Sequence, residues 1–253
     1  MIRLHGYVPD GFGIVIITPV VKDRLGDVCS ADNYRPVTLS PVVSKLFDYC
    51  VLHKYEHFLY SDELQFRFKN NSGCSHALFV LSQVVDYFST HGSTVYMVSL
   101  DASKAFDHVN HVKLFKTLID RVLPSCIIIM LINWYGKLFC TVSWKNSSSC
   151  LFSTRSGIRQ GGILSPFLFN ICMDTIISAL RSSDFGCHIG GCYIGCIAYA
   201  DDLILLSGSL TQLQMMLQLC ENEAQNMDLI FNCKKSCLFK VGVSFNEDVN
   251  NLH

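Results

Sequence analysis

Two adjacent acidic residues interrupt an otherwise apolar run of this 253-residue chain. In "GCIAYADDLILLSGS", Asp201 and Asp202 separate the apolar stretch 197–200 from the apolar stretch 203–206. Burying an unpaired carboxylate is costly, so these acids need either a turn that reaches water or a compensating cation. Because Asp is common in turns, the dipeptide taken alone favours a plain hairpin turn.

A third acidic residue, Asp101, follows the apolar strand pattern "VYMVSL". Two neighbouring strands could bring Asp101 close to Asp201 and Asp202, although the residues are far apart in sequence. Three carboxylates at one point repel unless cations lie between them, and oxygen ligands of this kind suit Mg²⁺. Two such ions about 4 Å apart would clamp the oxygens of a phosphoryl transfer. The pattern therefore has two interpretations. One is a metal site with Asp101 and Asp201 as the bridging pair, and the other is a simple turn.

A glycine-rich loop, "SGIRQGGILSP" at 156–166, carries Arg159 and Gln160 just before a predicted helix. Glycines let a ligand approach the backbone closely, and a helix N-terminus favours anions. An ordinary glycine loop is the alternative. The segment "DASKAFDH" offers further backbone N–H groups directly after Asp101.

Apolar periodicity and Pro, Gly and Ser signals predict strands and helices in no regular alternation, which favours an α+β fold. Ser40 and Ser165 are expected to cap helices that have Pro41 and Pro166 at their first positions. Strands are expected at 13–23 and 94–101, a hairpin around 145–149, two strands at 187–207 and a strand-turn-strand at 228–242. Expected helices cover 41–60, 76–92, 111–122, 126–139, 165–183 and 209–227.

Composition narrows the classes of protein. No window of eighteen uninterrupted apolar residues occurs, which predicts no membrane-spanning helix. The first residues lack a signal peptide's apolar region, so we expect an intracellular protein. No basic nuclear-import run is visible, so the residues themselves leave both the nucleus and the cytoplasm open. The net charge of −1 means that the chain as a whole has no positive potential that would attract nucleic acid. The thirteen cysteines lack paired CxxC spacing, which favours buried apolar thiols over a zinc site.

Several motifs, taken together and in order, resemble the reverse transcriptase domain of non-LTR retrotransposons of the long interspersed element type. They cover roughly residues 12 to 241. Each is weak alone, but the combination of the three that contain "AFDHVNH", "RQGGILSP" and "YADD" is highly specific. The motifs are "NYRPVTLSPVVSKLFDYCVLHKYEHFL", "QFRFKNNSGCSHALF", "VSLDASKAFDHVNH", "SGIRQGGILSPFLFNICMD", "IAYADDLILLS" and "IFNCKKS".

The resemblance implies a right-hand polymerase with fingers at roughly 12–93 and 125–165. It places the palm, a small antiparallel sheet backed by helices, at roughly 94–124 and 166–241. The implied activity is RNA-directed DNA synthesis from an RNA template, a DNA primer and deoxynucleoside triphosphates. The implied cofactor is two Mg²⁺ ions, with Mn²⁺ as an alternative. The ligands would be Asp101, Asp201, the more peripheral Asp202, and the carbonyl of Ala102.

Further roles follow from the same resemblance. Phe106 matches the position whose ring excludes a 2′-hydroxyl, and Lys235 matches a candidate general acid for the leaving pyrophosphate, with Lys234 adjacent. The remaining residues divide between the nucleotide and the primer end. Lys104, Ala105, Gln160, Gly161, Arg35 and, less directly, Lys22 would meet the nucleotide, and Tyr199 with Ala200 would form the floor near the primer end.

Two features depart from the family pattern. Arg67 stands where the family usually has glycine, and a positive φ there would strain the backbone. The chain also stops soon after the last motif, so the thumb, the N-terminal endonuclease and any C-terminal nucleic-acid-binding region are expected to be missing, as in a fragment (242–253 forming a truncated tail). The alternatives are a catalytically dead, element-derived nucleic-acid-binding or interaction protein, and a palm-like enzyme of another phosphoryl-transfer class, such as a cyclase.

Overall fold

The computed structural model describes residues 6–102 and 105–242. The chain forms two compact units, each made of two segments. The first unit comprises Met1–Tyr60 and Phe106–Leu168, and the second comprises Ser61–Ala105 and Phe169–His253. The second unit therefore contains the predicted strand that ends at Asp101 and the hairpin that contains Asp201.

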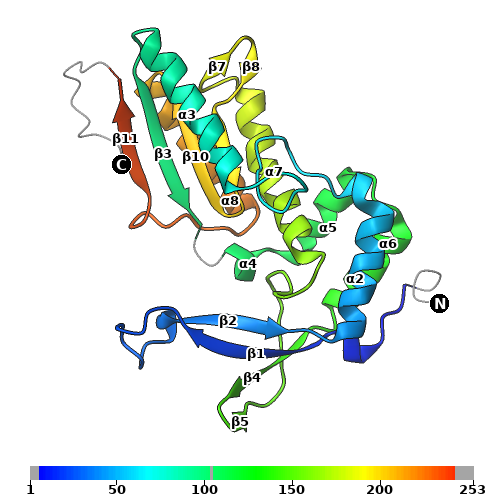
Figure 1. Ribbon diagram of the computed structural model, residues 1–253. Coiled ribbons are helices and arrows are strands. Elements are labelled where there is room, and N and C mark those ends of the chain that lie inside the picture. The colour runs from blue at the N-terminus through cyan, green and yellow to red at the C-terminus, as the bar shows by residue number, and fades with distance from the viewer. Residues whose placement is uncertain (1–5, 103–104, 243–253) are drawn as a thin grey trace. The chain divides into compact units, whose positions relative to one another are not determined.

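The first unit contains a five-stranded sheet, and Figure 1 labels four of its strands, β1, β2, β4 and β5. Strand β1 pairs antiparallel with β2 and parallel with β4, while β5 and β6 both pair with β4. The β-branched sequence "IVIITPVV" favours this extended state. The strands are β1 (Ile14–Val21), β2 (Tyr34–Leu39), β4 (Phe139–Trp144), β5 (Ser147–Ser148) and β6 (Phe152–Ser153).

Most helices of the first unit begin and end close to the expected positions. Asn110 caps α5 by accepting hydrogen bonds from Val112 N and Lys113 N at 2.9 and 3.2 Å. Helix α6 ends before the predicted 139, because Phe139 N bonds to Gly13 O and the residue joins β4. The helices are α2 (Val42–Tyr55), α4 (Ala105–His108, which begins in the second unit), α5 (His111–Asp120) and α6 (Ser125–Tyr135), with short 3-10 turns at Asp10–Phe12, Ala31–Asn33 and Glu56–Phe58.

The two expected serine caps are wrong. Pro41 rather than Ser40 holds the N-cap position of α2, and Ser40 Oγ is buried without a hydrogen-bond partner. Ser165 is already helical at the start of α7 (Ser165–Ser183), and its hydroxyl donates to Arg159 O in the preceding loop. Both serines are buried, and neither occupies the N-cap position of its helix.

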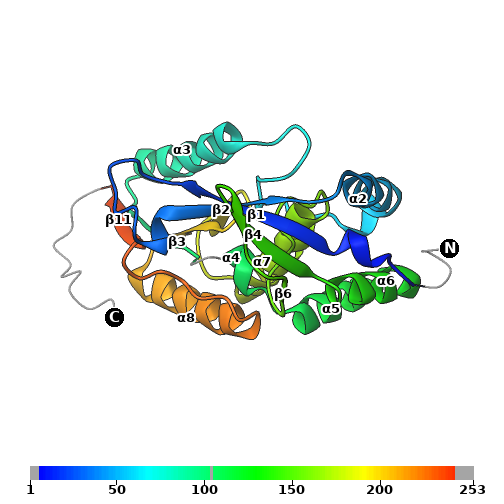
Figure 2. The same cartoon turned by 90° about the horizontal axis from the view of Figure 1, so that it is seen from below.

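A four-stranded antiparallel sheet in the order β11-β3-β10-β9 organises the second unit. Helices α3 and α8 lie on opposite faces of this sheet (Figures 1 and 2). The expected single hairpin at 187–207 is instead two, because β7 and β8 form their own pair ahead of β9 and β10. The elements are β3 (Val95–Asp101), β7 (His188–Ile189), β8 (Cys192–Tyr193), β9 (Cys196–Tyr199), β10 (Asp202–Ser207), β11 (Cys237–Val241), α3 (Cys74–Thr90) and α8 (Leu210–Asn226).

The core of the second unit joins the sheet to its helices. On the α3 face, Val84 packs in a cluster with Val95, Ile197 and Leu206. Helix α7 is largely buried, and its residues Phe169 and Ile176 are fully buried. The predicted strand at 228–231 is only an isolated bridge from Phe231 to Ala102. The rigid sheet that results is what holds the acidic residues at its end.

The units do not follow the expected finger and palm boundaries. Segment 61–93 groups with the four-stranded sheet, and segment 106–124 groups with the five-stranded sheet. Finger and palm ranges therefore stay predictions. Across residues 6–102 and 105–242, none of the helices combines the length and apolarity needed to cross a bilayer.

Candidate functional site: acidic sheet end and glycine loop

The acidic residues gather at one end of the four-stranded sheet. Strand β3 ends at Asp101 and β10 begins at Asp202, and the two residues are direct partners in the antiparallel register. Directly opposite residues of an antiparallel pair present their side chains on the same face. Asp201 lies beside them in the two-residue turn that joins β9 to β10, after Ala200. The sequence prediction that these distant acids meet is confirmed in this arrangement, although Asp202 rather than Asp201 is the residue opposite Asp101.

Lys235 brings a cation to the same place. Its Nζ lies 3.1 Å from Asp101 Oδ2, an oxygen that is buried and accepts no hydrogen bond. The contact is thus an ion pair rather than a hydrogen bond. Asn232 N donates to Asp101 O at 2.7 Å and Lys235 N donates to Asn232 O at 3.0 Å, so the loop before β11 is fastened to the end of β3. The residue in this ion pair is Lys235, and the general-acid role that the resemblance implies for it stays a prediction.

The electrostatics of Asp202 reflect this crowding. Partial loss of water raises the pKa of the Asp202 carboxyl, and the charges of Asp201 and Asp101 raise it further. The charges of Lys235 and Arg67 act in the opposite direction. A carboxylate beside like charges gains most from an added cation.

The carboxylates at this sheet end are oxygen donors of the kind that divalent ions take. Within the described residues no three His, Cys, Asp or Glu side chains form a ready-made metal cluster. The acids therefore interact through their charges without already forming a coordination shell. Asp101 Oδ2 is buried and accepts no hydrogen bond, and Lys235 Nζ is the cation 3.1 Å from it in this structure, so a divalent ion bound to this oxygen would take the place of that amine.

The neighbours of the acidic residues are placed as follows. Ala102 is buried and bridges to Phe231, while Lys104 lies outside the described residues. The Tyr199 ring lies under the guanidinium of Arg67, with 4.8 Å between Cζ and the ring centroid. Arg67 is absent from the residues with positive φ, and it is Phe68 that has φ 60°. The strain expected at Arg67 is therefore not found.

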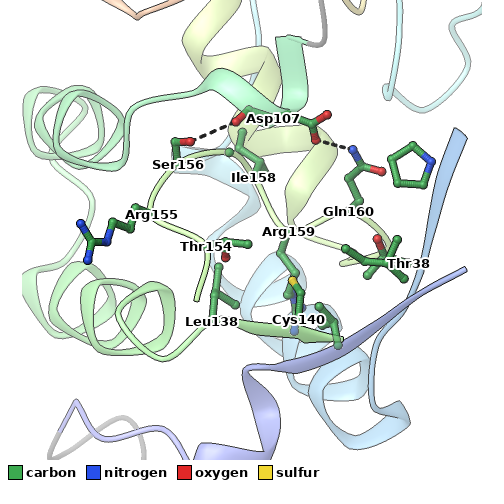
Figure 3. Close-up of a pocket in the computed structure, with 14 residues that line it drawn as sticks. Thr38, Asp107, Leu138, Cys140, Thr154, Arg155, Ser156, Ile158, Arg159 and Gln160 are labelled. Atoms are coloured by element: carbon green, nitrogen blue, oxygen red, sulfur yellow. Dashed lines mark hydrogen bonds between the residues drawn. The ribbon is translucent and has the colours of Figure 1, made fainter. Parts of the chain in front are cut away.

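In the first unit, the residues after Phe106 are tied to the glycine loop (Figure 3). Ile158 N donates to Phe106 O at 2.7 Å, and Ser156 Oγ donates to Asp107 O at 3.2 Å. Gln160 Nε2 donates to Asp107 Oδ1 at 2.6 Å. Phe106 and Asp107 are thus connected to the "RQGG" loop by hydrogen bonds within the first unit. Asp107, to which sequence reasoning gave no role in this loop, is the residue that joins them.

A cavity of about 330 Å³ opens beside this loop. Gln160, Thr38 and Pro36 line it, whereas Arg35 alternates to the other face of β2 and does not. The amine of Lys22 donates to Asp32 O at 2.7 Å within the loop between β1 and β2. Neither of these two expected phosphate-binding cations therefore joins Gln160 in this cavity. Its lining consists of Val15, Ile17, Pro36, Thr38, Asp107, Leu138, Cys140, Thr154, Arg155, Ser156, Gly157, Ile158, Arg159 and Gln160.

A buried ion pair between Arg159 and Asp48 connects the glycine loop to helix α2. The guanidinium of Arg159 donates to the Asp48 carboxylate and, at 3.1 Å, to Ser44 Oγ. It also stacks over the Trp134 ring, with 4.4 Å between Cζ and the centroid. Asp48 in turn accepts Ile163 N at 3.0 Å. Sequence analysis did not pair these residues, although both lie within its quoted motifs, because only the fold shows that they are buried together.

Gly161 shows why the loop is rich in glycine. Its φ of +78° lies in the left-handed region, and a Cβ at this position would overlap Thr38 O on β2. Gly157 has φ +86°, and its Cβ would lie 2.8 Å from Asp107 O. Both positions therefore require a residue without a side chain.

Comparison with known sequences agrees with this arrangement. The family described as "Reverse transcriptase (RNA-dependent DNA polymerase)" matches residues 22–246, and the chain belongs to this family. Its relatives include the Pol polyproteins of the type-2 retrotransposable element R2DM of Drosophila melanogaster and of the type-1 element R2 of Popillia japonica. Identity is 27% over 83% of this chain for the first and 28% over 95% for the second. The chain spans 20% and 34% of their lengths. The resemblance to reverse transcriptase domains of non-LTR retrotransposons is confirmed.

Solved structures give the same fold. A telomerase from Candida tropicalis, truncated from its C-terminal domain, matches with a TM-score of 0.64 at 16% identity over 95% of this chain and 52% of that chain. Telomerase from the same organism with a fragment of telomeric RNA matches with a TM-score of 0.62 at 15% identity over 92% of this chain and 42% of that chain. At this identity the likeness shows that the chain has a polymerase fold of mixed helices and sheets, as the α+β prediction stated.

Proposed function

We propose that this chain is the polymerase domain of a retrotransposon reverse transcriptase, which adds deoxynucleotides to a DNA primer along an RNA template. The observation that carries the proposal is the meeting of Asp101, Asp202 and Lys235 at one sheet end from three distant segments. In this proposal the four-stranded sheet is the palm and the five-stranded sheet belongs to the fingers. The names of the relatives support the class of reaction.

The acidic sheet end would hold divalent ions. Asp101, Asp201 and Asp202, with the carbonyl of Ala102, are the proposed ligands for two Mg²⁺ or Mn²⁺. When bound, such ions would stabilise negative charge on the attacking and leaving oxygens. Lys235 neutralises Asp101 before an ion enters, and its exposed amine would then be available to donate a proton to the leaving pyrophosphate.

The glycine loop and Phe106 would recognise the incoming nucleotide together. The bond from Ile158 N to Phe106 O and the bond from Gln160 to Asp107 support this, because they fix the loop and the ring-bearing segment as one piece. Phe106 would lie under the sugar and exclude a 2′-hydroxyl. Further contacts to the nucleotide or the primer end are proposed from the family resemblance alone, for Ala105, Gly161, Arg35, Lys22, Lys104, Tyr199 and Ala200.

Primer extension tests the proposal. Purified protein is incubated with Mg²⁺, an RNA template annealed to a DNA primer, and deoxynucleoside triphosphates. Extension is expected for the unaltered protein and for the control Asp86→Asn, an exposed acid on α3. It should be lost in Asp101→Asn and in the double variant Asp201→Asn with Asp202→Asn. Extension that survives both changes contradicts the assigned roles.

Two other outcomes distinguish the alternatives. Salt-dependent binding of the template–primer without incorporation, at any Mg²⁺ or Mn²⁺ concentration, indicates a nucleic-acid-binding protein without catalysis. A cyclic product from a single nucleoside triphosphate indicates a different phosphoryl-transfer enzyme. Replacing deoxynucleotides with ribonucleotides tests Phe106, since Phe106→Ala is expected to increase ribonucleotide incorporation.

A further inference from the structure

The segment around Gln65 lies along the edge of β9, next to the acidic turn. Ala198 N donates to Leu64 O at 2.8 Å and Phe66 N donates to Ala198 O at 2.9 Å, so Gln65 and Ala198 form a parallel bridge. This segment belongs to the "QFRF" motif, to which the sequence analysis assigned no chemistry. It is the only part of the second unit's described chain that bridges to β9 in parallel.

The Gln65 side chain is fully buried, with 0% of the residue exposed, and it bonds to both backbone groups of Ala200. Ala200 N donates to Gln65 Oε1 at 2.9 Å, and Gln65 Nε2 donates to Ala200 O at 3.2 Å. The same Oε1 accepts Arg67 N at 3.1 Å. Because two N–H donors face one end of the amide and a carbonyl faces the other, the orientation of the amide is fixed by its partners.

Ala200 needs such support. Its φ is 60°, in the left-handed region that alanine disfavours, and the residue is buried in the turn. It lies beyond the last ladder pair of β9 and β10, between Tyr199 and Asp202, so the sheet provides no partners for its backbone. Gln65 supplies those partners. The backbone angles of Ala200 also set the direction in which the chain continues into Asp201 and Asp202.

We propose that Gln65 is a positioning residue for the acidic turn: its amide fixes the backbone of Ala200 and so determines where Asp201 and Asp202 present their carboxylates to a divalent cation. The binding of a cation at this turn rests on the proposed function, whereas the role of Gln65 in holding the turn does not. Residues that orient metal ligands typically change metal affinity 10- to 100-fold when they are removed.

The test uses Gln65→Leu, which keeps the size of the side chain and removes the amide. Gln218→Leu is the matched control, because Gln218 is exposed on α8 of the same unit. Mn²⁺ binding is measured by electron paramagnetic resonance on protein that circular dichroism shows to be folded. Hydrogen exchange is followed at the amides of Ala200 and its neighbours. We expect Gln65→Leu to weaken Mn²⁺ binding about tenfold and to accelerate exchange in the turn, and the control to change neither.

A second variant keeps the test decisive if Gln65→Leu does not fold. Gln65→Met keeps the length and approximate volume of the side chain, adds no charge and removes both the acceptor for Ala200 N and the donor to Ala200 O, so effects of the same sign and similar size are expected. A folded variant with the control's Mn²⁺ affinity and the control's exchange rate overturns the proposal. If the unaltered protein binds Mn²⁺ no better than Asp201→Asn with Asp202→Asn, the metal site of the proposed function fails. Hydrogen exchange then still decides whether Gln65 holds the turn.

Discussion

Asp202 lies directly opposite Asp101 in the antiparallel register of β10 and β3, so two carboxylates share one face at the end of a sheet. Like charges directly opposite one another destabilise a strand pair. Lys235 forms an ion pair with Asp101, but the charges of Lys235 and Arg67 do not cancel the effects that raise the pKa of Asp202. This arrangement suits a protein that binds cations at the sheet end. Without a bound cation, the repulsion between the two carboxylates lowers the stability of the folded state.

The first prediction concerns stability without metal. In the presence of a chelator, Asp202→Asn should raise the free energy of unfolding by a few tenths of a kcal/mol, because it removes the cross-strand repulsion. Urea denaturation at neutral pH measures the difference. Asp86→Asn, on the exposed surface of α3, should change nothing. A variant less stable than the unaltered protein would show that the carboxylates do not repel.

The pH dependence follows from the raised pKa of Asp202. A carboxyl whose pKa is higher in the folded than in the unfolded state binds its proton more tightly when folded. The unaltered protein should therefore gain stability relative to Asp202→Asn as pH falls from neutral through the raised pKa. The gain should be complete near the ordinary value of 3.8. Urea denaturation of both proteins at several pH values checks this. A stability difference that stays constant with pH contradicts it.

Arg67 should affect the titration of Asp202 through charge alone. Its guanidinium lowers the pKa of that carboxyl, so Arg67→Gly is expected to raise it further, while Arg67→Lys should leave it nearly unchanged. Carboxyl chemical shifts in a nuclear magnetic resonance titration report the pKa directly. A fall of the Asp202 pKa in Arg67→Gly would mean that the guanidinium acts on Asp202 mainly by some route other than its charge.

The buried pair of Asp48 and Arg159 should be far more sensitive than a surface pair. Asp48→Ala leaves a buried guanidinium without its carboxylate and should cost about 3–5 kcal/mol of unfolding free energy. The control is Asp10→Ala, which breaks the exposed 2.8 Å contact to Lys137 and should cost less than about 1 kcal/mol. Denaturant unfolding compares them. Equal costs would show that burial does not govern the Asp48 pair.

Gly161 offers a test of the loop geometry. Gly161→Ala meets both a left-handed φ and the carbonyl of Thr38, whereas Gly190→Ala meets only a left-handed φ of +58° in open space. The control should cost about 1–2 kcal/mol, and Gly161→Ala should cost more. Because the loop must shift to admit the methyl group, the Michaelis constant for deoxynucleotides should also rise in primer extension. Equal effects of the two changes would exclude the contact with Thr38.

Much of the local structure was predictable. The β-branched run at 14–21 is a strand, the predicted helix at 165–183 is α7 from end to end, and Asp101 ends a strand as its apolar pattern indicated. These signals are local, because periodicity and turn residues act on neighbours in the chain. The motifs also determined the family, since their order and spacing are properties of the sequence itself.

Only the tertiary structure decided how distant segments meet. Sequence analysis named Asp101 and Asp201 as a metal-bridging pair, which stays a prediction, and it gave no strand register. The structure decided that Asp202 lies opposite Asp101 in the ladder. Two further contacts have no local sequence pattern, because each joins segments more than a hundred residues apart in sequence. They are the hydrogen bonds of Gln65 to Ala200 and the ion pair of Asp48 with Arg159. The serine caps predicted from local signals were also wrong, because Ser40 Oγ is buried without a hydrogen-bond partner and Ser165 Oγ donates to Arg159 O. The sequence thus determined which acids the chain carries to strand ends, and packing decided which atoms face one another there.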